Sequence, residues 1–95
     1  MRIYSLTNDS GRAVANQFVR DYENGEKVFQ SYETDIAHIA MGKVTLTRSW
    51  DYSATTTKYL CVFLTNELGC DKLNKAKVKK MIDKGLFKLT NKTEL

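Results

Sequence analysis

The chain has 95 residues, of which 42% are hydrophobic and 11% aromatic, and it contains five glycines and no proline. A chain of this length buries roughly two-thirds of its unfolded surface around one hydrophobic core, which excludes two independent cores. The aromatic content is typical of a folded protein, and no stretch rich in Pro, Gly or Ser divides the sequence. We expect a single domain over residues 1–95, with a sheet in 1–50, a helical layer in 51–86 and a flexible tail in 90–95.

The net charge of +4 and the pI of about 9.1 exclude a mimic of DNA, because such a protein needs a dense negative surface. The longest apolar run, Tyr59–Leu64, has six residues, far fewer than the roughly twenty that span a bilayer. Met1–Ser5 alternate polar and apolar side chains and lack the apolar stretch of a secretory signal. We therefore expect a protein without membrane contact that works in the cytoplasm.

Strand-like segments fill the first half of the chain. Ile3–Leu6 precedes the turn residues Asn8–Gly11, and Asn24-Gly25 lies between two β-prone segments at 16–20 and 27–32. Both residues of Asn-Gly tolerate positive φ, which is why this dipeptide is typical of tight hairpins. We predict a hairpin between these two segments.

The next two segments, 36–41 and 44–50, are separated by a second turn at Gly42-Lys43. In the later segment, side chains of one parity are apolar (Val44, Leu46 and Trp50) and those of the other are polar (Lys43, Thr45, Thr47 and Ser49). This alternation is typical of an antiparallel strand with one buried and one solvated face. The predicted fold class is α+β, an N-terminal antiparallel sheet of three to five strands packed by two C-terminal helices.

The period changes after Trp50, where a first helix is predicted over 54–68. Asp51 or Ser53 can cap its first N–H groups, and Gly69 can end it in a left-handed conformation. Its long apolar run leaves little surface for water, so we expect this helix to lie across the sheet.

A second, shorter helix is predicted from Asp71 or Asn74 to Lys84, closed by Gly85. A short strand at 87–89 can follow, before a polar and frayed end. The apolar face of the second helix consists of Val78, Met81, Ile82 and Leu86.

The positive charge is local. Residues 71–95 carry eight lysines and three acids, a net charge of +5, whereas residues 1–70 have a net charge of −1. The second helix could contact phosphates or an acidic protein surface, or its lysines could simply keep the outer face soluble. It contains no arginine, the usual bidentate reader of guanine, which disfavours sequence-specific DNA recognition. The candidate nucleic-acid-binding residues are Lys75, Lys77, Lys79, Lys80 and Lys84.

Catalytic chemistry has little support in the sequence. Cys61, Cys70 and the single histidine, His38, cannot supply four zinc ligands without help from carboxylates, so we expect no metal and no cofactor. A Cys61 nucleophile with His38 and either Asp35 or Asp51 is an enzyme hypothesis that no motif supports. We predict a protein that is not an enzyme, with Cys61 a reduced, buried hydrophobe and His38 a partly buried strand residue.

The junction from Trp50 to Ser53 is a strand-to-helix corner that holds several residues suited to recognition. Aromatic packing at the bend explains it structurally, and this is the interpretation that we favour. The functional alternative is an aromatic and cationic patch, because Tyr and Trp concentrate binding energy at interfaces. The candidate protein-binding residues are Arg48, Trp50, Tyr52, Lys58 and Tyr59.

Four segments resemble a family of small uncharacterised proteins of tailed phages and mobile elements. They lie at 13–18, 29–32, 42–46 and 50–59, and the last has the pattern W-D-Y-S-x-T-T-x-K-Y. The resemblance covers about residues 10–85 and transfers no activity and no site residues. It implies a phage or prophage accessory protein that acts inside a bacterium.

By analogy, this context suggests stoichiometric binding to a host bacterial protein, including anti-defence inhibition of a nuclease complex such as a CRISPR effector. The alternative is a nucleic-acid-associated protein that uses the lysine-rich second helix. The sequence predicts neither the partner's identity nor the oligomeric state.

Overall fold

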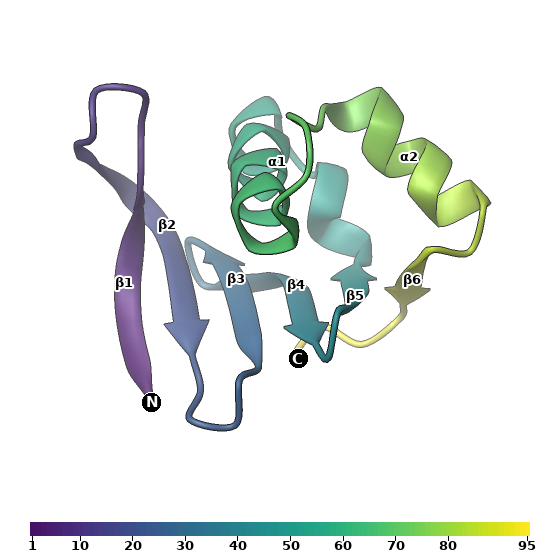
Figure 1. Ribbon diagram of the computed structural model, residues 1–95, viewed down its shortest axis with the longest axis horizontal. Coiled ribbons are helices and arrows are strands. Elements are labelled where there is room, and N and C mark those ends of the chain that lie inside the picture. Colours follow the sequence, from purple (N-terminus) through teal and green to yellow (C-terminus); the bar gives the residue numbers. More distant parts are fainter.

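Six strands form one sheet and follow one another across it in sequence order (Figure 1). The computed structural model describes residues 1–95. Its strands are β1 (Arg2–Thr7), β2 (Ala13–Asp21), β3 (Lys27–Ser31), β4 (Thr34–Ala40), β5 (Lys43–Thr47) and β6 (Phe87–Thr90). Neighbours from β1 to β5 pair antiparallel, whereas β6 runs parallel to β5. The α+β class is confirmed, but the predicted number of three to five strands is wrong, and the sheet is mixed.

The parallel pairing follows from the connection between β5 and β6. After β5 the chain forms the 3-10 helix η1 (Arg48–Asp51), then α1 (Ala54–Leu68) and α2 (Lys75–Asp83). A long helical crossover returns the chain to the end of the sheet where β5 begins, so the next strand runs in the same direction. The four residues of β6 are too few for their own pattern to specify this pairing.

The predicted hairpin and helix caps are confirmed, whereas the turn predicted at Gly42-Lys43 lies one residue earlier, at Met41-Gly42. Gly25 has a φ of 88° in the turn between β2 and β3. The Ser53 side chain caps α1, and Gly69 ends α1 with a φ of 62°. The Asn74 side chain caps α2, rather than Asp71. Both α-helices therefore begin where a short polar side chain accepts a hydrogen bond from the backbone, and α1 ends at a glycine.

The first helix covers one face of the sheet and closes the core, as predicted. The ring of Phe63 on α1 stacks on Phe29 of β3 with the ring centroids 5.6 Å apart. Val78 of α2 joins the same buried cluster. Leu86 does not, and its exposed fraction of 62% corrects the prediction, because α2 ends at Asp83 and the helical spacing stops before Leu86. No helix is both long enough and apolar enough to cross a bilayer.

The opposite face of the sheet is less solvated than the alternation predicted. Thr47 is 2% exposed, because its hydroxyl donates a hydrogen bond of 2.7 Å to the Asp35 carbonyl. The segment after β6 returns along this face, where the Leu95 amide donates to Asp35 Oδ2 at 2.8 Å. Residues 91–95 thus lie against the sheet through at least one specific contact (Figure 1).

Candidate functional site

The corner between β5 and α1 holds one large aromatic side chain in the core and presents another to solvent. Trp50 is 7% exposed, and its carbonyl accepts a hydrogen bond of 3.3 Å from the hydroxyl of Thr57. Tyr52 is 84% exposed, although its amide is fixed by a hydrogen bond of 3.1 Å to the Ser49 carbonyl. The next residue, Ser53, caps α1. An exposed tyrosine therefore stands on a backbone that is anchored on both sides.

A groove, here called the helix groove, runs along α1 beside this corner and has a volume of ≈ 860 Å³. The residues of α1 that line it recur every three to four positions, which places them on one face of the helix. The segment before α2 forms the other wall, held by a hydrogen bond of 3.1 Å from the Leu73 amide to the Thr65 hydroxyl. The lining consists of Asp9, Asp51, Tyr52, Ser53, Ala54, Thr57, Lys58, Cys61, Val62, Thr65, Asn66, Lys72, Leu73, Asn74 and Lys75.

Three lysines from three segments meet at the helix groove. Lys58 comes from α1, Lys72 from the connecting segment and Lys75 from the first turn of α2, and none of them forms an ion pair. Asp9 and Asp51 also line the groove, so its net charge is +1. Both helices begin at this groove, and neither has an acid in its own first turn to offset the positive end of its dipole.

A second groove, here called the sheet groove, lies on the other side of Tyr52 and Ser53, which line both. Its rim includes Asn16 and Tyr32, two non-glycine residues with φ values of 64° and 56°. The Tyr32 amide donates to the Asn16 carbonyl at 2.7 Å, which holds the two left-handed residues together. The other lining residues are Phe18, Gln30, Ser31, Glu33, Thr34, Ile36, Ser49, Thr55 and Thr56.

The structure brings together two of the five residues predicted for protein binding. Tyr52 and Lys58 line the helix groove. Trp50 is buried, and Tyr59 is half-buried with the Lys58 ammonium 5.3 Å from its ring centroid. Arg48 lines neither groove and donates a hydrogen bond to the side chain of Asn91 instead.

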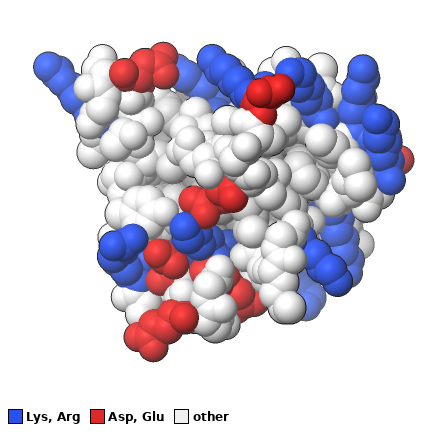
Figure 2. Space-filling view, in the orientation of Figure 1, with Lys and Arg blue, Asp and Glu red and all other residues white.

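The five lysines predicted for nucleic-acid binding are all exposed and none forms an ion pair. Figure 2 shows Lys and Arg side chains along the upper and right-hand edges, where Figure 1 places α2. Lys75 alone among the five lines the helix groove, and the Lys77 ammonium bonds the Lys72 carbonyl at 3.3 Å. The ion pairs of the protein instead use acids in or near β2, β3, β4 and α1.

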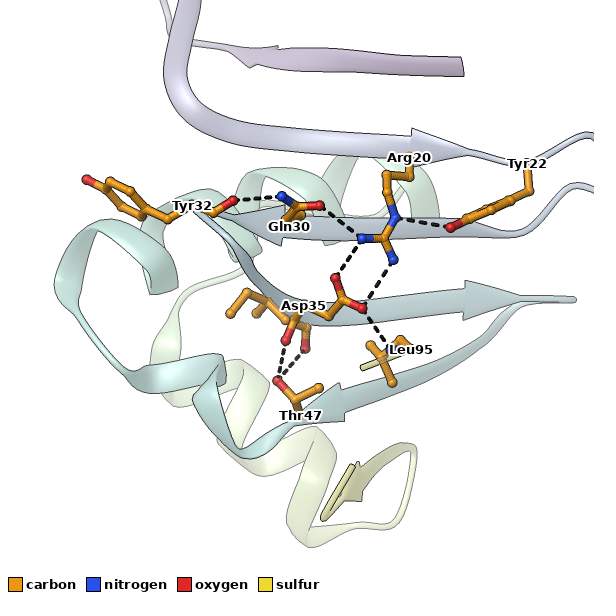
Figure 3. Close-up of polar contacts among 8 residues, drawn as sticks. Arg20, Tyr22, Gln30, Tyr32, Asp35, Thr47 and Leu95 are labelled. Carbon is orange, nitrogen blue, oxygen red and sulfur yellow. Dashed lines mark hydrogen bonds and ion pairs between the residues drawn. The ribbon is translucent and has the colours of Figure 1, made fainter. Parts of the chain in front are cut away.

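A polar cluster on the face of the sheet opposite α1 was not predicted (Figure 3). Arg20 on β2 makes two hydrogen bonds to Asp35 on β4, at 2.7 and 3.1 Å, and the exposed fractions of the two side chains are 18% and 8%. Arg20 also donates to Tyr22 and Gln30, and its hydrogen bond to Asp35 raises its pKa. The partners are fifteen residues apart, so no local sequence signal joins them. The cluster links four strands and the chain end.

The groups required by the enzyme hypothesis do not meet. His38 Nε2 lies 3.2 Å from Glu26 Oε1, on the face of the sheet opposite α1, while Cys61 lies on α1. Burial raises the pKa of the Cys61 thiol, which disfavours the reactive thiolate. No group of three His, Cys, Asp or Glu side chains is placed to hold a metal ion.

Comparison with known proteins gives a family and no nearer relative. No curated protein and no solved structure matches the chain. The model of a family of unknown function, DUF8033, matches residues 1–84, which include the whole sheet up to β5, both helices and both grooves. The chain therefore belongs to the family of unknown function DUF8033.

Proposed function

We propose that this protein is a phage-type accessory protein that binds one host bacterial protein stoichiometrically, in the host cytoplasm, through the surface around Tyr52. The observation that carries the proposal is the position of Tyr52, a tyrosine 84% exposed on the ridge between two grooves. Tyrosine is enriched among the residues that dominate binding energy at protein interfaces.

The surroundings of Tyr52 support a protein partner. Its backbone is anchored before binding, which lowers the entropy lost on association. Both grooves beside it combine apolar floors with hydroxyl, amide and charged groups, the mixture found in protein interfaces. The resemblance of residues 50–59 to phage proteins supports a host target, and an anti-defence role against a nuclease complex is the specific form of the proposal.

The test is affinity capture from the bacterial host, followed by reconstitution of the complex from purified components. We expect a complex of fixed stoichiometry in which Tyr52→Ala weakens binding at least about tenfold, or about 1.4 kcal/mol. Met41→Ala, at a turn residue that is 99% exposed, is the control and should bind as the wild type does. Equal affinities for the two variants would place the interface elsewhere.

The second candidate is a nucleic-acid-associated protein, favoured by the exposed α2 lysines that have no acidic partner. Such lysines release condensed counterions when they meet phosphates, so binding must weaken steeply with salt. Gel-shift titration at two salt concentrations tests this candidate. A shift at low salt that the triple change Lys79→Glu, Lys80→Glu and Lys84→Glu removes would support it, and no shift at low salt would exclude it.

A further inference from the structure

We infer that the helix groove binds an acidic segment of a protein partner that also carries apolar side chains, an inference that rests on the proposed function and names the chemistry of its partner. The groove has the volume of a ligand site, ≈ 860 Å³. Its α1 wall extends from Ala54 to Asn66, about 18 Å at the helical rise per residue. That length accommodates about five residues of an extended segment or about twelve of a helix.

The floor of the helix groove is apolar. Cys61 and Leu73 reach it from opposite walls, and only 7% and 6% of their surfaces are exposed. Val62, on the next position of α1, is half-buried beside them. An apolar side chain of a partner that packs on this floor leaves water itself, and this burial favours binding.

Two of the three lysines on the rim lie toward one end of the groove and favour acids there. Leu73 is bonded to Thr65, so its neighbour Lys72 lies beside the C-terminal half of α1, with Lys75 just beyond it. Asp51 and Tyr52 lie at the opposite end, where α1 begins. Lys58, Lys72 and Lys75 have no acidic partner within the chain, and carboxylates of a bound segment would supply one.

The same composition disfavours a nucleic acid as the occupant of this groove. A phosphate backbone carries charge along its whole length and would meet Asp9 and Asp51, whereas a peptide segment can place its acids only beside the lysines. No arginine lines the groove either. Lys79 and Lys80, on the outer face of α2, have no acidic partner and do not line the helix groove. A polyanion would use that outer face, whereas an acidic and apolar segment would use the groove, so the two surfaces can be tested separately.

The experiment compares two triple variants with the same change in net charge. The groove variant carries Lys58→Glu, Lys72→Glu and Lys75→Glu, and the control carries Lys79→Glu, Lys80→Glu and Lys84→Glu. All six lysines are exposed, and Lys75→Glu places an acid in the first turn of α2, where it favours the helix. Thermal unfolding checks that both variants fold.

Peptides of twelve random residues are selected by display on the wild-type protein, and the most enriched peptide is synthesised and titrated by fluorescence anisotropy. We expect this peptide to combine Asp or Glu with Leu, Ile or Phe. Its affinity for the control variant should lie within about threefold of its affinity for the wild type, and its affinity for the groove variant should be at least about tenfold weaker than for the wild type. The inference would be overturned if no peptide were enriched, if the enriched peptide contained no acids, or if both variants lost affinity for it equally. Displacement of the bound peptide by a single-stranded DNA 20-mer would also overturn it.

The outcome is separable from that of the proposed function. A host complex that is weakened by Tyr52→Ala but unaffected by the groove variant would overturn the inference and leave the proposed function standing. A selected peptide that binds the groove as described, with no host complex captured, would overturn the proposed function and leave the groove a peptide site.

Discussion

Gln17 is a buried residue whose side-chain amide has no hydrogen-bond partner. It lies on β2, is 0% exposed, and neither its amide nitrogen nor its amide oxygen has a hydrogen-bond partner. Its neighbour across the sheet, Ser31, bonds Thr56 of α1 at 3.1 Å, so Gln17 belongs to a polar layer under the start of that helix. A buried amide without partners costs free energy that an apolar side chain of similar shape would not.

Replacing Gln17 with Met should therefore stabilise the protein. We expect Gln17→Met to raise the free energy of unfolding by about 1–2 kcal/mol, measured by urea denaturation. The matched control is Gln30→Met, because Gln30 accepts from Arg20 and donates to the Tyr32 carbonyl, so its loss should destabilise. Destabilisation by Gln17→Met would mean that the amide has a partner in solution, such as a buried water.

At the scale of elements, the start of α1 connects stability to the candidate site. The Ser53 hydroxyl accepts from the Thr56 amide and also contacts the Thr56 hydroxyl, both at 3.1 Å. Ser53→Ala should lower the free energy of unfolding by about 1–2 kcal/mol, because an N-cap is lost from a helix that packs on the core. Thr55→Ala, at an exposed position of the first turn, is the control and should stabilise slightly. Equal effects in the two variants would contradict a capping role.

Elements with local signals could be predicted, and those that depend on distant partners could not. The caps of both helices and the hairpin at Gly25 follow from a few adjacent residues. The parallel pairing of β6 depends on where the chain returns after two helices. The burial of Thr47 depends on a contact with Asp35, twelve residues away in the sequence.

The same distinction applies to the candidate site. Tyr52 and Lys58 could be identified because the first lies in the corner at 50–53 and the second follows it closely in the sequence. The wall supplied by Lys72 and Leu73 arises only when the connecting segment packs against α1. Arg48 and Trp50 lie beside and within the same corner, but the Arg48 side chain bonds Asn91 and the Trp50 side chain is buried in the core.

At the scale of the whole molecule, the Arg20–Asp35 pair ties the sheet to the chain end (Figure 3). Arg20→Leu should lower the free energy of unfolding by about 3 kcal/mol, because it leaves the Asp35 carboxylate buried without its partner. The double change Arg20→Leu and Asp35→Leu should recover part of this loss, since it removes both desolvated charges. Urea denaturation of the wild type, of Arg20→Leu, of Asp35→Leu and of the double variant measures the coupling. A double variant less stable by the sum of the single losses would show that the pair does not act as a unit.

Lys27 and Cys61 give the stability of the whole protein the same dependence on alkaline pH. The Lys27 ammonium bonds Glu67 at 2.7 Å, and this hydrogen bond is the main cause of its raised pKa. A charged Lys27 therefore stabilises the fold below the ordinary lysine pKa, and this contribution is lost as the pH rises through the raised value. Burial raises the pKa of Cys61. Above about pH 8.5 the unfolded chain releases the thiol proton more readily than the folded protein does, which again lowers stability.

The free energy of unfolding should consequently fall as the pH rises above about 8.5, first through Cys61 and then through Lys27 and through Tyr4, whose pKa burial raises. Cys61→Ala should make the decline shallower at the lower end of this pH range, and Glu67→Gln should make it shallower at the upper end. Both expectations concern the slope with pH and not the stability at neutral pH. Cys70→Ala, at an exposed cysteine, is the control for the first change. The measurement is urea denaturation at steps of pH. Parallel profiles for the wild type and Cys61→Ala would mean that the thiol titrates alike in the folded and unfolded chains, and that α1 does not hold Cys61 away from water.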